Sequence, residues 1–244
     1  MNHRTGENRT VSMYPVSPIG EGADTQRYRF QWNFPILFST HHPKRLYAGG
    51  NCLFMTEDEG RNWQVISPDL TTNDKARQAP SGGMITKDNT GVEYYCTLFA
   101  IAESPLEEGV IWCGSDDGLL HITHDNGAHW EQVNPPDMPA WVMINCIEPS
   151  PLEKGVCYVT GTRYKSDDEQ PYLYKTDDDG KHWKRIINGL PPRAFTRCLR
   201  AHPTQKGLMM VHRNGKPSRT DYEVMQSSKF YSLLKFRLHH GRTH

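Results

Sequence analysis

Short apolar runs separated by polar turns recur along this chain, and they predict strands rather than helices. Runs such as "ILFS", "RLYAGG", "CLFM" and "WQVI" are rich in the β-branched and aromatic residues that favour extended backbone. Clusters of Pro and Gly separate them, as in "HHPKR" and "SPDL", and mark turns. Runs this short, bounded by turn residues, are typical of strands. The pattern therefore predicts an all-β chain with much loop.

One eight-residue motif occurs three times among these runs. "TEDEGRNW", "THDNGAHW" and "TDDDGKHW" all read T-x-D-x-G-x-x-W. The positions they share are Thr56, Asp58, Gly60 and Trp63; Thr123, Asp125, Gly127 and Trp130; and Thr176, Asp178, Gly180 and Trp183. The flanking apolar runs recur as well, so the motif, called the octet below, belongs to a longer repeat.

The octet stands between the third and fourth of four apolar runs in each repeat. This order predicts four-stranded antiparallel units of about 40–50 residues, the scale of a β-propeller blade. We expect blades at residues 27–67, 96–134 and 142–189, a partial blade at 195–211, and a long inter-blade loop at 68–95. Three complete blades and a part of a fourth would form an open arc, a fragment of a larger propeller.

A structural role explains the spacing within the octet. An aspartate at a strand corner can accept hydrogen bonds from nearby backbone N–H groups, and a glycine permits the positive φ of a tight reversal. The tryptophan then begins the next strand and can bury its ring between sheets. We therefore interpret Asp58, Asp125 and Asp178 as residues that close turns rather than as catalytic groups.

The octet resembles the Asp-box, also called the BNR repeat. Asp-boxes occur in sialidases, sortilin-like receptors, two-propeller xyloglucanases and photosystem assembly factors. Stretches such as "YAGGNCLFMTEDEGRNWQVISPDLT" and "IWCGSDDGLLHITHDNGAHW" look most like the large bacterial sortilin-like BNR proteins, many of them labelled glycosyl hydrolases. The resemblance covers about residues 27–209 and implies a β-propeller from a much longer, usually exported protein. It implies no settled activity.

The two ends of the chain depart from the repeat. Residues 1–26 have no strand pattern, and we expect a poorly structured lead-in there, without a signal peptide. Residues 212–244 carry seven Lys/Arg and two Asp/Glu, and no octet. This leaves 21 basic and 26 acidic residues in the remainder. We interpret the basic tail as disordered or as sequence that is not native to the propeller, from a reading-frame slip or a truncated gene.

Candidate catalytic groups are few. A glycoside hydrolase needs two facing carboxyls. The best acids outside the octets are Asp116 and Asp117 in "GSDDGLL", Asp167 and Asp168 in "KSDDEQP", and Asp88 and Glu93 in the long loop, and we take Asp88, Asp116 and Asp117 as the candidates. Asp-Gly is also a strong hairpin signal, so "SDDG" fits a turn equally well. Trp141 suits the core or an exposed sugar-stacking position. The long loop, longer than a connection needs, suits packing or a ligand.

We accordingly expect a non-catalytic propeller module that binds a protein or glycan partner. The alternative is part of a sialidase-like or xyloglucanase-like glycoside hydrolase whose catalytic residues lie partly outside this chain. The remaining blades of a parent protein are a further expected partner. We expect no cofactor, no metal site, no nucleic acid and no membrane span, because the six cysteines lack metal spacing and no apolar run is long enough. The family resemblance implies a periplasmic or extracellular location.

Overall fold

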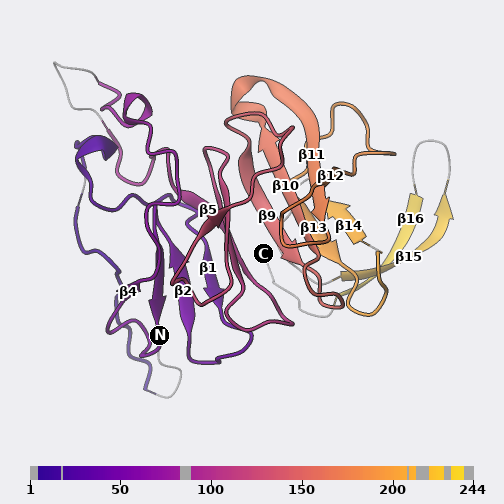
Figure 1. Ribbon diagram of the computed structural model, residues 1–244, viewed down its shortest axis with the longest axis horizontal. Coiled ribbons are helices and arrows are strands. Elements are labelled where there is room, and N and C mark those ends of the chain that lie inside the picture. Colours follow the sequence, from indigo (N-terminus) through magenta and orange to yellow (C-terminus); the bar gives the residue numbers. More distant parts are fainter. Residues whose placement is uncertain are drawn as a thin grey trace. The chain divides into compact units, whose positions relative to one another are not determined.

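The computed structural model describes residues 5–17, 19–82, 89–207, 209–212, 220–227 and 232–238. The chain divides into two compact units, Met1–Arg213 and Asn214–His244. No helix among the described residues has the length and apolarity to cross a membrane. Figure 1 shows that arrows dominate the ribbon, with only short helical turns between them.

The first unit contains three four-stranded antiparallel sheets within its described residues, as predicted. Blade one is formed by β1 (Ile36–Phe38), β2 (Leu46–Gly49), β3 (Leu53–Thr56) and β4 (Gln64–Val65). Blade two is formed by β5 (Leu98–Glu103), β6 (Ile111–Ser115), β7 (Leu120–Thr123) and β8 (Glu131–Gln132). Blade three is formed by β9 (Met143–Pro149), β10 (Cys157–Arg163), β11 (Asp168–Thr176) and β12 (Lys184–Arg185). Each sheet is a meander, with every strand beside its neighbours in sequence.

The partial fourth blade consists of β13 (Cys198–Ala201) and β14 (Met209–His212). In the second unit, β15 (Thr220–Ser227) and β16 (Ser232–Leu238) pair as an antiparallel hairpin. Three 3-10 turns complete the described elements: η1 (Ala23–Thr25) in the lead-in, η2 (Lys75–Arg77) in the long loop, and η3 (Tyr164–Ser166) after β10.

The hydrophobic core lies between successive blades. Leu53 of blade one packs in one cluster with Leu98 and Ile111 of blade two. Trp112 and Ile122 of blade two share a second cluster with Ile144 of blade three. A third cluster joins blade three to the partial blade. Each sheet is thus buried by its neighbours, as expected for a stacked repeat.

The octets form the turns between the third and fourth strands. In the third octet, Asp178 accepts hydrogen bonds from the Thr176 hydroxyl at 2.9 Å and from the His182 backbone N–H at 2.9 Å. The Gly180 N–H donates to the Thr176 hydroxyl at 2.9 Å, and Gly180 has a φ of +86°. The same bonds recur in the other two octets.

A further position of the octet, two residues after the glycine, also contacts the aspartate. Asn62 Nδ2 donates to Asp58 Oδ2 at 2.7 Å, and His129 Nδ1 and His182 Nδ1 lie 2.6 Å from the second oxygen of Asp125 and Asp178. These side-chain and backbone hydrogen bonds stabilise the ionised form. They lower the pKa of each octet aspartate to about 2.

Each octet also forms a junction with the chain segment that precedes its blade. The Trp130 indole N–H donates to the Ile66 carbonyl at 2.9 Å, just beyond β4. The Trp183 indole N–H donates to the Val133 carbonyl at 2.8 Å, just beyond β8. The octet glycines pack against the same two residues: a Cβ on Gly127 would lie 2.4 Å from the Ile66 oxygen, and one on Gly180 2.8 Å from the Val133 Cβ.

Blade one has no preceding blade in this chain, and its junction differs accordingly. The Trp63 indole N–H is buried without a hydrogen-bond partner among the described residues. A Cβ on Gly60 would lie 2.3 Å from Val11, so the lead-in takes the place that Ile66 and Val133 take elsewhere. Met13 of the lead-in packs in the same cluster as Trp63.

The register of the strands places the octets at one end of the sheets and the other loops at the opposite end. In blade two, Ile111 pairs with both Glu103 and Thr123 at the octet end, whereas Leu98 pairs with Ser115 at the other. The Asp116–Leu119 turn, the long loop, the approach to β9 and η3 all lie at the non-octet end, because each borders the matching strand terminus. We call this end the loop face.

The tryptophan junction predicts that replacing Trp130 or Trp183 destabilises the fold more than replacing Trp63. Trp130→Phe and Trp183→Phe each remove one hydrogen bond between blades and should lower the free energy of unfolding by about 1 kcal/mol more than the loss of ring area alone. Trp63→Phe makes the same change where the N–H has no acceptor among the described residues, and it serves as the control. Urea unfolding measures all three, and equal losses at the three sites would contradict the junction.

The octet aspartates predict a loss of stability in acid. Their folded pKa of about 2 lies below the ordinary value near 4, so their contribution is complete above pH 4 and is lost as the pH falls toward 2. Asp178→Ala should lower the melting temperature at pH 7 and flatten its acid dependence. Asp177→Ala, an exposed neighbour, should do neither. Thermal melts from pH 2 to pH 7 measure both effects, and equal behaviour of the two variants would contradict the stabilising role of Asp178.

Candidate functional site

The two predicted candidate acids of the loop face are buried and fully engaged. Asp116 and Asp117 form the β6–β7 turn, and their side chains are 3% and 2% exposed. Asp116 accepts from the backbone N–H and the hydroxyl of Thr97, at 2.9 and 3.1 Å, and from Gln31. The third candidate, Asp88, lies outside the described residues. The carboxyls of Asp116 and Asp117 are therefore buried inside the fold and are not exposed in an open cleft.

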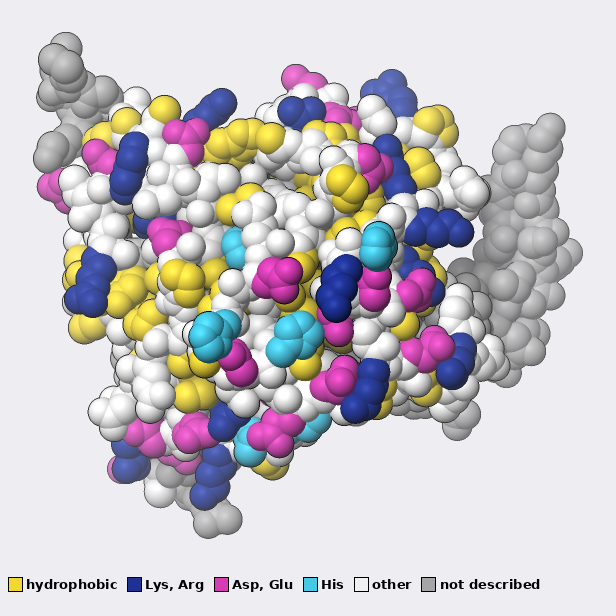
Figure 2. All heavy atoms as spheres, in the orientation of Figure 1, with side chains coloured by type: hydrophobic (Ala, Val, Ile, Leu, Met, Phe, Trp, Pro, Cys, Tyr) yellow, Lys and Arg dark blue, Asp and Glu magenta, His cyan; other side chains and the backbone are white. Residues whose placement is uncertain are grey.

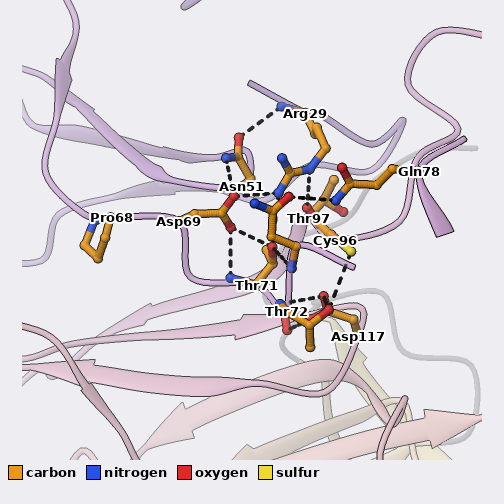
Figure 3. A network of polar contacts seen from close by, with 12 residues as sticks. Arg29, Asn51, Pro68, Asp69, Thr71, Thr72, Gln78, Cys96, Thr97 and Asp117 are labelled. Atoms are coloured by element: carbon orange, nitrogen blue, oxygen red, sulfur yellow. Dashed lines mark hydrogen bonds and ion pairs between the residues drawn. The ribbon is translucent and has the colours of Figure 1, made fainter. Parts of the chain in front are cut away.

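Asp117 fastens the long loop to blade two. Its second oxygen accepts from the Thr72 backbone N–H at 2.9 Å and from the Thr72 hydroxyl at 2.7 Å (Figure 3). Its first oxygen accepts from Ser115. The loop that leaves β4 is thus anchored on the β6–β7 turn of the next blade.

Arg29 anchors the beginning of the same loop. The Arg29 side chain is 2% exposed, and its Nη2 lies 2.7 Å from Asp69 Oδ2. Its Nε donates to the Cys96 carbonyl at 3.0 Å, and Asn51 Nδ2 donates to Asp69 at 2.9 Å (Figure 3). A buried, paired guanidinium fixes the geometry around it because leaving it unpaired would be costly. This network holds the loop that carries η2.

Burial shifts the pKa values of groups around this network. Desolvation raises the pKa of Asp116 to about 6, against the lowering effect of its hydrogen bonds from Thr97. Desolvation lowers the pKa of His121, on β7, to about 4, so this imidazole is neutral at pH 7. Its Nδ1 is buried without a partner among the described residues. Asp116 and His121 therefore belong to the buried structure under the loop face.

A continuous set of stacked cations and aromatic rings lies on the loop face above this network. The Arg77 guanidinium of η2 lies 5.2 Å from the centre of the Trp141 ring, and Trp141 meets Tyr95 edge to face at 5.5 Å. The Lys165 ammonium of η3 lies 4.8 Å from the centre of the Tyr95 ring. These four residues come from the long loop, the approach to β5, the approach to β9 and η3.

The set continues onto the partial fourth blade. Arg197, which precedes β13, lies 5.0 Å from the centre of the Tyr164 ring and 5.2 Å from that of Phe195. Tyr164 is the neighbour of Lys165 in η3. We call the full set the cation–aromatic row: Arg77, Tyr95, Trp141, Tyr164, Lys165, Phe195 and Arg197. Figure 2 shows Lys and Arg side chains beside hydrophobic ones along the upper edge of the molecule.

The backbone beneath the row is held in an uncommon conformation. Trp141 has a φ of +65° and Cys96, which follows Tyr95, a φ of +64°. Bulky residues adopt this left-handed region at a cost, which the surrounding structure must offset. A Cβ on Gly118 would lie 3.2 Å from the Trp141 nitrogen, so the β6–β7 turn packs directly on this backbone. The backbone that carries Tyr95 and Trp141 is therefore held by its packing on this turn.

The sequence singles out only part of the row. Trp141 was expected either in the core or stacking on sugar; it is half-buried and stacks on Arg77. The other arginines form separate contacts, with Arg163 on Asp168 and Arg200 on Glu148. No spacing along the chain marks Arg77, Tyr95 and Lys165 as neighbours. The excess length of the long loop is a signal for Arg77 and Tyr95, but not for Lys165 in η3.

The buried carboxyl of Asp116 predicts a stability loss on the alkaline side of its unfolded pKa. Because its folded pKa is raised to about 6, its burial favours folding below pH 4 and loses that advantage as the pH rises through 6. Asp116→Asn keeps the shape of the side chain and removes its charge. The free energy of unfolding of this variant should therefore lack the decrease, on the order of 2 kcal/mol between pH 4 and pH 6.5, that Asp116 causes in the unsubstituted protein. Urea unfolding at pH 4.5 and 7 measures this, with exposed Asp167→Asn as the control. An unchanged pH slope in Asp116→Asn would contradict it.

Comparison with curated proteins finds only short similarities. No family model matches the chain. Ribosomal large subunit pseudouridine synthase D of Haemophilus influenzae is 33% identical over 66 residues, which are 26% of this chain and 20% of that protein. The enzyme of the same name from Haemophilus ducreyi is 46% identical over 43 residues, or 18% of this chain and 13% of that protein. The chain thus spans a fifth or less of these relatives.

Comparison with solved structures concerns the larger part of the chain. An ancestral GH74 enzyme matches 83% of this chain with 27% of its own, at a TM-score of 0.53 and 13% identity. YCF48 bound to D1 peptide matches 77% of this chain with 54% of its own, at a TM-score of 0.42 and 15% identity. At such identities the first of these shows the fold alone. Together with the three antiparallel four-stranded sheets, it establishes the chain as an all-β protein with a partial β-propeller fold.

Proposed function

We propose that this chain is a non-catalytic interaction module that binds a protein or glycan partner on its loop face. The observation that carries the proposal is the cation–aromatic row, a contiguous set of partly exposed rings and cations fixed by buried hydrogen bonds. Aromatic and arginine side chains on a rigid support are typical of binding surfaces, because little conformational entropy is lost when they are covered.

The alternative role, part of a glycoside hydrolase, needs two carboxyls about 5–10 Å apart across an open cleft. Asp116 and Asp117 instead accept hydrogen bonds from Thr97, Thr72 and Ser115 inside the fold. A polar cleft at Asp167–Gln170 and Arg193 is also present, but two of its acids pair locally, Glu169 with Arg193 at 2.8 Å and Asp168 with Arg163 at 3.6 Å. These contacts favour the binding role.

We further propose that the similarity to pseudouridine synthase D belongs to the C-terminal part of the chain. The octet repeat accounts for the chain through blade three, whereas residues 212–244 lack the octet and are basic. That part also forms a separate compact unit from Asn214 onward. The matched stretches of 43 and 66 residues are longer than residues 212–244, so a match placed there also takes in the end of the repeat. The similarity supplies no activity, because it spans so little of the relatives.

Two matched double variants test the binding role. Arg77→Ala/Lys165→Ala removes two exposed cations from the loop face, and Arg61→Ala/Lys181→Ala removes two exposed cations from the octet end. Both change the net charge equally. A glycan array and a peptide array, probed with the labelled protein, should give ligands whose signal falls at least tenfold in the first variant only. Ligands lost equally in both variants, or in the second alone, would refute a partner site on the loop face.

A further inference from the structure

Building on the proposed binding role, we infer that the cation–aromatic row recognises an acidic segment of a protein partner, bound in an extended form. Three cations of the row, Arg77, Lys165 and Arg197, have no ion pair in the part of the chain that the structure describes. Arg197 Nε is in addition buried, with no hydrogen-bond partner among the described residues. The row therefore holds positive charge that no described carboxylate pairs with.

The acids close to the row are committed to other contacts. Asp168 is held by the Tyr172 hydroxyl at 2.6 Å and the Gln170 N–H at 3.0 Å, and Glu169 pairs with Arg193. Asp116 is buried and bonded to Thr97, although the charge of Lys165 also acts on it and partly offsets the rise in its pKa that desolvation causes. Asp167, which is exposed, adds one acid to the η3 loop. The cations are thus largely uncompensated by the chain itself, and a ligand that brings carboxylates would pair with them.

The charge of the rest of the propeller sharpens this assignment. Residues 1–211 hold more acids than bases, 26 against 21, so the net charge of this part of the chain repels an acidic partner. Uncompensated cations on one face would then select the position at which such a partner binds. A nucleic acid needs a broad basic surface, which this acidic body does not supply.

The stacking geometry favours carboxylates over a neutral sugar. Neutral sugars dock on open ring faces, but here Arg77 lies over Trp141, Lys165 over Tyr95, and Arg197 over Tyr164 and Phe195. A stacked guanidinium keeps its N–H edge free for a bidentate carboxylate, and the stacking restricts its rotamers in advance. The spread of the cations from the long loop to blade three and the partial fourth blade suits a chain that crosses the face rather than a compact ligand.

Synthetic peptides of defined charge test this inference. A fluorescein-labelled peptide of alternating Glu and Ser should bind the full chain, with an affinity that falls severalfold as salt rises from about 50 to 300 mM. The peptide with Gln in place of Glu should bind at least tenfold more weakly. Arg77→Gln/Lys165→Gln should lower the affinity for the acidic peptide at least tenfold. Lys165→Arg should retain that affinity, and Arg61→Gln/Lys181→Gln, the control at the octet end, should leave it unchanged. Melting temperatures verify that the variants fold.

The outcomes separate this inference from the proposed function. If the Gln peptide binds as well as the Glu peptide, or if polygalacturonate binds at the row and the acidic peptide does not, the acidic-protein assignment is wrong. The binding role still holds in that case, provided that array ligands depend on Arg77 and Lys165. If no array ligand depends on these two residues and the acidic peptide does not bind, both proposals fail.

Discussion

The junction between an octet tryptophan and the end of the preceding blade is the interaction on which the fold depends. Each blade is a sheet whose outer strand has only two residues, and such a sheet is not stable alone. The indole N–H, the octet glycine and the buried clusters between sheets together attach one blade to the next. Folding of one blade is therefore coupled to the presence of its neighbour.

The two ends of the sheets differ in structure, because the octet ends repeat and the opposite ends do not. The octet ends are short turns closed by their own threonine and aspartate, and they repeat with little variation. The opposite ends carry long, dissimilar loops that must be fastened individually, as Arg29 and Asp117 fasten the segment after β4. Variation is tolerated on the loop face because the junctions do not pass through it, and this is where the chain places its exposed rings and cations.

The sequence allowed the repeat to be predicted because its signals are local. Thr, Asp, Gly and Trp at fixed spacing specify a turn whatever surrounds it, so the blades and their four-stranded meanders are correctly predicted. The cation–aromatic row was not predictable, because Arg77, Trp141 and Lys165 approach one another only through the stacking of blades. Likewise, nothing in "SDDG" distinguishes a buried anchor from an exposed acid; the difference arises from the loop that packs on it.

Trp63 belongs to the octet whose blade follows the lead-in rather than another blade. Among the described residues its N–H has no carbonyl partner such as those of Trp130 and Trp183, and Val11 and Met13 of the lead-in pack against this octet. Within this chain, blade one shares a buried cluster with one neighbouring blade, whereas blades two and three each share clusters with two. Fewer buried contacts between sheets make the local free energy of opening smaller at blade one than at the two blades covered on both sides.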